Sequence, residues 1–137
     1  MNSRTEADPA IGEAYRVQAA VYSEAMIALL EDGRHQAAAL VAVQVVRSAA
    51  LGLLAACAGV AAVEEDPIAL LWSTLPEVRQ IPALQQGANV VALHEDLTHY
   101  AYSLDADEAR EVVDEALAFR AWTVAPETAA LIIRPVR

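Results

Sequence analysis

The chain has 137 residues, of which 56 % are apolar and 5 % aromatic, and it carries five glycines and a formal net charge of −10. This length suits one domain with a sizeable core, and so few glycines argue against a β-rich fold full of tight turns. The negative field repels phosphate backbones at long range, so we expect no strong nucleic-acid binding.

Three features predict a cytoplasmic protein without a membrane span. Cys57 is the single cysteine, which excludes an internal disulfide and fits a reducing compartment. The N-terminal sequence MNSRTEADPA lacks the basic start and apolar stretch of a signal peptide. The apolar run 37–63 contains Gln44, Arg47 and Ser48 near its middle, and a central Arg alone costs about 2.5–3.5 kcal/mol on insertion scales.

The first half of the chain predicts two long antiparallel helices. Asp8 followed by Pro9 is a typical helix start, and an apolar pattern of helical period continues through Glu31. Gly33 is a natural left-handed stop, and the tight break EDGR turns the chain back on itself. The next helix, about 34–58, is apolar almost all round, which is typical of a central helix packed on several sides.

The second half predicts shorter helices. A short segment at 68–72 precedes the sequence TLPEVRQIP, whose two prolines interrupt regular structure. A helix of about 83–102 follows, and Asp105 with Glu108 forms a capping-box pattern that opens a last helix, through about residue 122. The tail 125–137 contains a strand-like apolar run at 130–133, which should pack on the bundle or on another subunit.

These segments predict an all-α protein, an antiparallel four- to five-helix up-and-down bundle. We expect a single domain over residues 1–137, with its core at about 9–124.

Polar chemistry is concentrated in the stretch LHEDLTHY, residues 93–100, which holds two of the three histidines. On a helix, the core stripe consists of Val90, Leu93, Leu97 and Ala101. His99 then points away from the core with Glu95 four residues before it, and His94 lies at the border of the core stripe. Asp96 completes the polar set.

The spacing of this stretch argues against a metal. His94 and His99 are five residues apart, whereas two ligands on one helix need a spacing of three or four. Glu95 and His99 could supply two ligands, but no second Glu-x-x-His motif or cysteine cluster completes a shell. We therefore expect neither a metal nor another cofactor.

Other residues could contribute to a groove beside this stretch. Arg47 interrupts the most apolar helix, which implies a carboxylate partner, an interface groove, or a position at the helix edge where its head reaches solvent. Tyr100 and Tyr102 flank the motif and either line a groove or pack against the next helix.

The chain contains, in order, a long helix, the turn EDGRHQAA, the Ala-rich helix AALVAVQVVRSAALGLLAA, the helix with LHEDLTHY and the closing helix DADEAREVVDEALAFRAW. Over about residues 12–124 this order resembles the HEPN superfamily of small helical domains. In catalytic members of that superfamily, an Arg and a His separated by four to six residues lie at a homodimer groove. These domains cleave RNA without a metal. The resemblance therefore implies a homodimer with its site on the fourth predicted helix.

Carried over to this chain, His99 matches the motif His, His94 falls on the Arg position and Glu95 follows it. An imidazole, neutral for much of the time at pH 7, thus replaces an always-charged guanidinium, and Glu95 adds a negative charge where RNA would bring another. The resemblance implies a homodimeric interaction or small-ligand-binding module whose groove is degenerate and non-catalytic.

Two alternatives remain open. The first is a metal-independent ribonuclease toxin with His99 as acid or base and a cation supplied from elsewhere, neutralised by a nucleotidyltransferase-type antitoxin, as the resemblance implies. The second is a His/carboxylate metal bundle of the DinB-like sort, whose three histidines on separate helices are not matched here. The residues expected at the groove are His99, His94 and Glu95 at the motif positions, with Arg47, Asp96, Tyr100 and Tyr102 around them.

Overall fold

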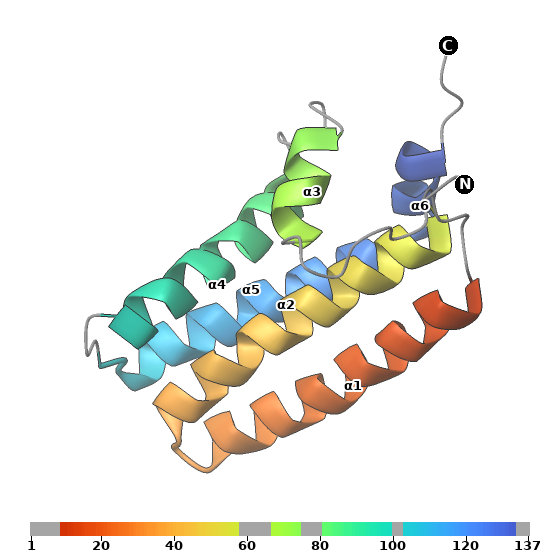
Figure 1. Ribbon diagram of the computed structural model, residues 1–137. Helices are drawn as coiled ribbons and strands as arrows, with labels where there is room; N and C mark the ends of the chain where they lie inside the picture. Colours follow the sequence, from red (N-terminus) through yellow and green to blue (C-terminus); the bar gives the residue numbers. More distant parts are fainter. Residues whose placement is uncertain (1–8, 58–66, 75–80, 100–102, 134–137) are drawn as a thin grey trace.

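The computed structural model describes residues 9–57, 67–74, 81–99 and 103–133, and within these ranges it contains six α-helices and no strand (Figure 1). The predicted all-α class and the up-and-down bundle are therefore confirmed. Four long helices alternate in direction along the bundle: α1 (Pro9–Glu31), α2 (His35–Cys57), α4 (Pro82–His99) and α5 (Ala106–Val124). Two short helices complete the described chain: α3 (Pro67–Thr74) and α6 (Pro126–Ile133).

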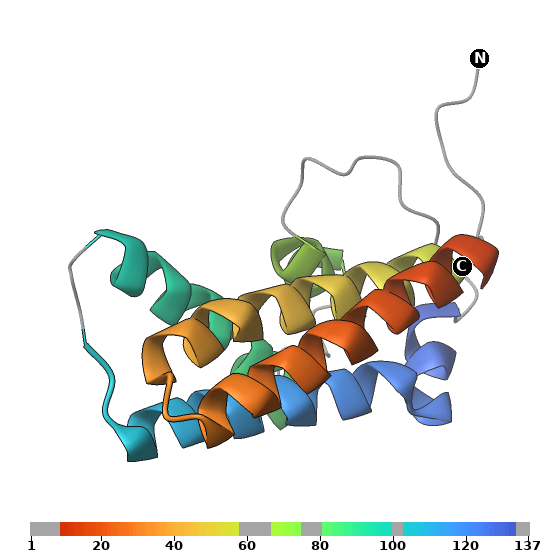
Figure 2. The same ribbon diagram turned by 90° about the horizontal axis from the view of Figure 1, so that it is seen from below.

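The helix α2 is the centre of the bundle, because it packs against each of the other five helices. Figures 1 and 2 show it enclosed by α1, α4 and α5, while α6 lies at the end of the bundle where α1 begins. Its length and composition would let His35–Ala56 cross a membrane, and 67 % of the apolar 18-residue window in this helix is buried inside the structure. The core consists of Ala, Val and Leu side chains of α2 packed against side chains of its neighbours, among them Met26, Leu84, Val90 and Phe119.

The predicted turn between α1 and α2 is confirmed. Gly33 has a φ of 76°, in the left-handed region that favours glycine. The amide of Gly33 donates to the carbonyl of Leu30 at 3.0 Å, and the amide of Arg34 donates to the carbonyl of Leu29 at 2.9 Å. This pair of bonds is a Schellman motif, which ends α1 and sends α2 back antiparallel.

The predicted start of α5 is confirmed as well. Asp105 is the N-cap, and its Oδ1 accepts a hydrogen bond from the amide of Glu108 at 2.8 Å. In return the amide of Asp105 donates to Oε1 of Glu108 at 3.2 Å, which completes the capping box. These bonds also hold the Glu108 side chain at the first turn of α5.

Two close approaches between helices depend on glycine. An added Cβ at Gly12 would lie 2.8 Å from Cβ of Ala56, so α1 and α2 nearly touch there. An added Cβ at Gly87 would lie 2.5 Å from Cδ1 of Phe119, whose buried ring packs directly against the backbone of α4. The position of α4 over α5 therefore rests on the absence of a side chain at Gly87.

The strand-like run predicted at 130–133 is wrong, because Pro126–Ile133 is helical. Pro126 takes the first helical position and Glu127 places an acidic side chain in the first turn, and both favour a helix start. The fully buried Thr128 shows that α6 folds back on its own bundle, where it packs against α2 and α5. The predicted helix ends at residues 58 and 102, and the prolyl break after residue 75, lie outside the described residues.

Candidate functional site

The polar stretch of α4 lies as the helical pattern predicts. Val90 and Leu97 are buried, and Leu93 is partly buried against the core. His94 is half-buried at the border of this stripe. Its neighbours Glu95 and Asp96 are exposed, so two carboxylates face solvent next to the half-buried imidazole.

Several expected site residues lie at or beyond the end of α4. His99 is the last residue of α4, and its side chain is outside the described part of the structure. Tyr100 and Tyr102 also lie outside the described residues. Thr98 is exposed, and its hydroxyl donates to the carbonyls of His94 and Glu95, both at 3.0 Å. These bonds join its side chain to the backbone of the preceding turn of α4.

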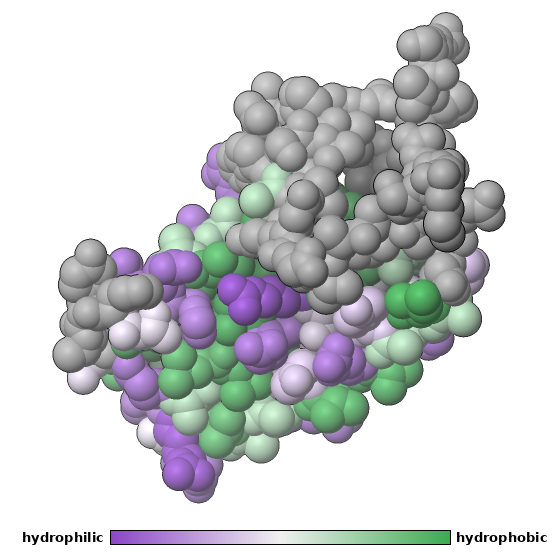
Figure 3. Space-filling view, viewed as in Figure 1, coloured by the Kyte–Doolittle hydropathy of each residue, from purple (hydrophilic) through white to green (hydrophobic). Residues whose placement is uncertain are grey.

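Arg47 is half-buried in the middle of α2. It lies on a narrow open stripe of this helix between Leu40, which is 38 % exposed, and Leu51. Polar residues gather over the middle of α2 on this face, with apolar residues on either side (Figure 3). Within the described residues Arg47 makes no ion pair. This half-buried place fits the expected helix-edge arginine.

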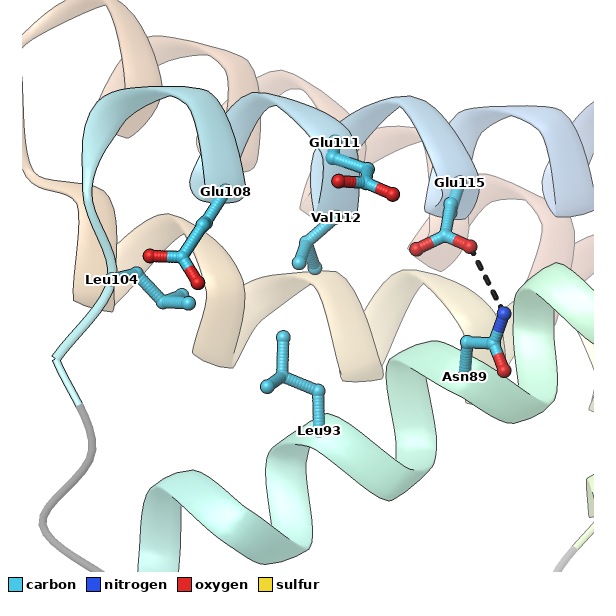
Figure 4. Close-up of a pocket in the computed structure, with 7 residues that line it drawn as sticks. All are labelled: Asn89, Leu93, Leu104, Glu108, Glu111, Val112 and Glu115. Atoms are coloured by element: carbon cyan, nitrogen blue, oxygen red, sulfur yellow. Dashed lines mark hydrogen bonds between the residues drawn. The ribbon is translucent and has the colours of Figure 1, made fainter.

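A groove that the sequence did not predict lies between α4 and α5, with a volume of about 230 Å³. Its floor is apolar and consists of Leu93, Leu104 and Val112. Its polar wall consists of Asn89 from α4 and three carboxylates from α5, namely Glu108, Glu111 and Glu115 (Figure 4).

The arrangement of the three carboxylates follows from helix geometry. Spacings of three and four residues put Glu108, Glu111 and Glu115 on one face of α5, next to α4. The side chain of Asn89 donates to Oε2 of Glu115 at 3.2 Å, which ties the two helices together (Figure 4). The spacing of these glutamates was the signal in the sequence, but the sequence could not show that their face borders α4.

The groove has a clear chemical character. Three carboxylates on one face make a locally negative wall above an apolar floor. Because they lie three and four residues apart, these like charges also repel each other. Such a site attracts a cationic group with an apolar stem and repels phosphate. Within the described residues, no group of three or more His, Cys, Asp or Glu side chains could hold a metal ion.

Comparisons of the chain with protein-family models, with curated proteins and with solved structures find no match.

Proposed function

We propose that this chain is a cytoplasmic, homodimeric HEPN-like module that binds a partner or a small ligand beside α4 and does not catalyse a reaction. The observation that carries this proposal is the acidic groove between α5 and α4, the helix that bears the histidine stretch. Glu108, Glu111 and Glu115 line it above an apolar floor. A binding function needs no more than such a shaped and charged surface, whereas RNA cleavage needs cations for the phosphate.

The charges around α4 support binding over cleavage. The half-buried His94 stands where the HEPN motif has an Arg, and Glu95 and Asp96 are exposed beside it. With the glutamates of α5, a phosphate backbone laid along α4 would meet like charges, and each close repulsion costs on the order of 1 kcal/mol even in water. The net charge of −10 adds a long-range barrier.

The expected ligand of the groove is a lysine or arginine side chain of a partner protein. The apolar stem would pack on Leu93 and Val112, and the charged head would face the glutamates. The homodimer is supported by the outer face of α1, where Val17 is 55 % and Val21 is 59 % exposed. Four residues separate them, so they share one face, which a second subunit would cover.

The first experiment tests catalysis. The purified protein is incubated with RNA in excess chelator, next to the variant His99→Ala. We expect no cleavage above background in either sample. Chelator-resistant cleavage by the wild type that disappears in the variant would overturn the proposal and establish the ribonuclease alternative. Light scattering on the same sample should give twice the chain mass of 14.6 kDa.

The second experiment tests the groove itself. N-acetyl-arginine amide is titrated into labelled protein, and binding is followed through amide chemical shifts. The double variant Glu111→Gln/Glu115→Gln should weaken binding by at least about tenfold, since the loss of even one charge-assisted hydrogen bond costs about 1.5–3 kcal/mol. Asp114→Asn is the matched control on the exposed face of α5 and should bind like the wild type. Equal loss in the control would show that only net charge matters, and would contradict a groove site.

A further inference from the structure

A second hollow lies on the other side of α5, where this helix meets α1 and α2. Two arginines from different helices line it, Arg16 of α1 and Arg120 of α5. The rest of its wall is small or apolar and consists of Ala19, Ala49, Thr123 and Val124. We call this hollow the arginine cleft. Its volume is about 30 Å³, and one water-sized sphere needs roughly 10–15 Å³, so about two oxygen atoms fit.

Arg16 lines this cleft with a side chain that is 38 % exposed and that has no strong partner among the described residues. Its Nε is buried and makes no hydrogen bond with any described residue. Its ion pair joins NH1 to Oε2 of Glu13 at 4.0 Å, the outer limit for such a contact, and the side chain of Glu13 is 67 % exposed. An exposed pair at this distance contributes little. The buried donor of a permanently charged group therefore remains to be satisfied.

The second arginine of the cleft, Arg120, is half-buried. Within the described residues its guanidinium makes no ion pair. The hydroxyl of the buried Thr123 donates to the carbonyl of Arg120 at 2.6 Å, which orders the last turn of α5 around this residue. With a net charge of −10, this chain has many carboxylates available to neutralise cations. Within the described residues, the weak contact to Glu13 is the one ion pair that either arginine of this cleft makes.

The position of Arg16 depends on the small residues around it. Its Cγ lies 3.3 Å from the place that a Cβ at Gly52 would occupy, so the apolar stem of Arg16 rests on the backbone of α2. Ala19 and Ala49 leave open the space that a larger side chain would fill. Small residues thus leave the cleft open, and the apolar stem of Arg16 packs beside it on the backbone at Gly52.

We propose that the arginine cleft is a binding site for a small oxyanion, whose oxygens are held between Arg16 and Arg120. Planar guanidinium groups bind carboxylate and phosphate oxygens through paired, charge-assisted hydrogen bonds, and the Nε–H of Arg16 would be one of the donors. This site is separate from the acidic groove, because the two hollows share no lining residue.

The test uses the whole protein and inorganic phosphate. Thermal unfolding and calorimetric titration are measured in phosphate and in chloride at the same ionic strength of about 0.15 M. We expect phosphate to raise the unfolding temperature and to bind with a dissociation constant of about 1 mM, as two or three such hydrogen bonds allow. Acetate in a parallel arm separates the two oxyanions: a larger response to acetate assigns the cleft to carboxylates, and a larger response to phosphate assigns it to phosphoryl groups.

Variants decide whether the cleft is responsible. Arg16→Gln and Arg120→Gln should each weaken phosphate binding by at least about tenfold. Arg110→Gln removes the same charge from an exposed site on α5 and should leave binding unchanged. If a glutamine variant does not fold, Arg16→Lys and Arg120→Lys keep the charge without the fork and should bind between these limits. Phosphate that acts no differently from chloride, or an equal loss in Arg110→Gln, would overturn the proposal.

Discussion

The two sides of α5 carry opposite charge. Towards α4 the helix presents Glu108, Glu111 and Glu115 above an apolar floor, and towards α1 it presents Arg120 opposite Arg16. The two sites differ in size as well, because the acidic groove has a volume of about 230 Å³ and the arginine cleft about 30 Å³. One bundle therefore presents hollows of opposite charge, because neighbouring helices cover opposite faces of the same helix.

A glycine contact shapes each side. On the acidic side, Gly87 lets α4 come down onto the ring of Phe119, and on the basic side, Gly52 lets the stem of Arg16 rest on α2. The charges select the ligand, but these two backbone contacts set the helix spacing in which the charges act. Substitutions can therefore change either the helix spacing at these glycines or the charges of the two hollows.

The largest effect is expected from Gly87→Ala, which attacks the acidic side. Helix propensity alone would make this change stabilising by about 1 kcal/mol. The new Cβ would meet Phe119 at 2.5 Å, however, and such overpacking costs about 1–3 kcal/mol or more. We expect a net loss of stability in urea unfolding and a weaker response to N-acetyl-arginine amide. The phosphate response of the arginine cleft should persist, and a stabilised variant would contradict the close approach of α4 to α5.

A smaller effect is expected from Asp105→Ala, which removes the N-cap of α5. Loss of such a cap costs about 1 kcal/mol, and here it also releases Glu108 at the edge of the acidic groove. Asp107→Ala is the matched control, since Asp107 lies exposed in the same first turn but is not the cap. At this exposed position it should cost only about 0.3 kcal/mol, through the helix dipole alone. Equal losses in denaturant unfolding would show that the capping box is not special.

The sequence was enough to predict features that depend on neighbouring residues. Gly33 ends α1 and the Asp105–Glu108 box starts α5, because both signals act within one turn of helix. The central place of α2 was also predicted, because a helix that is apolar almost all round must be packed on several sides. The tail was the error: the apolar run at 130–133 was predicted to be strand-like, whereas Pro126 begins a helix that packs on α2 and α5.

The two sites could not be predicted in the same way. The spacing of Glu111 and Glu115 shows that they share a face, but only the fold shows that this face borders Asn89 of α4. The meeting of Arg16 and Arg120 depends on how three helices pack, and no local pattern encodes it. The histidine stretch is visible in the sequence because histidines are rare in this chain. The acidic groove and the arginine cleft consist of common residues that only the fold brings together.

The smallest effect on stability is expected from Arg16→Met, and its size is what makes it informative. Methionine keeps an apolar stem for the surface of α2 but removes the buried Nε–H that has no partner among the described residues. Removing an unsatisfied buried donor costs little, so in chloride buffer we expect the free energy of unfolding to stay within about 1 kcal/mol of the wild type or to rise. Glu13→Gln, which removes only the exposed pair at 4.0 Å, should change the free energy of unfolding by a few tenths of a kcal/mol, at about the limit of measurement.

In phosphate the wild type should gain stability and Arg16→Met should not. A loss of several kcal/mol in chloride would mean that the guanidinium is already satisfied within the protein. The basic side of α5 would then be a structural contact, and only the acidic groove would remain as a binding site.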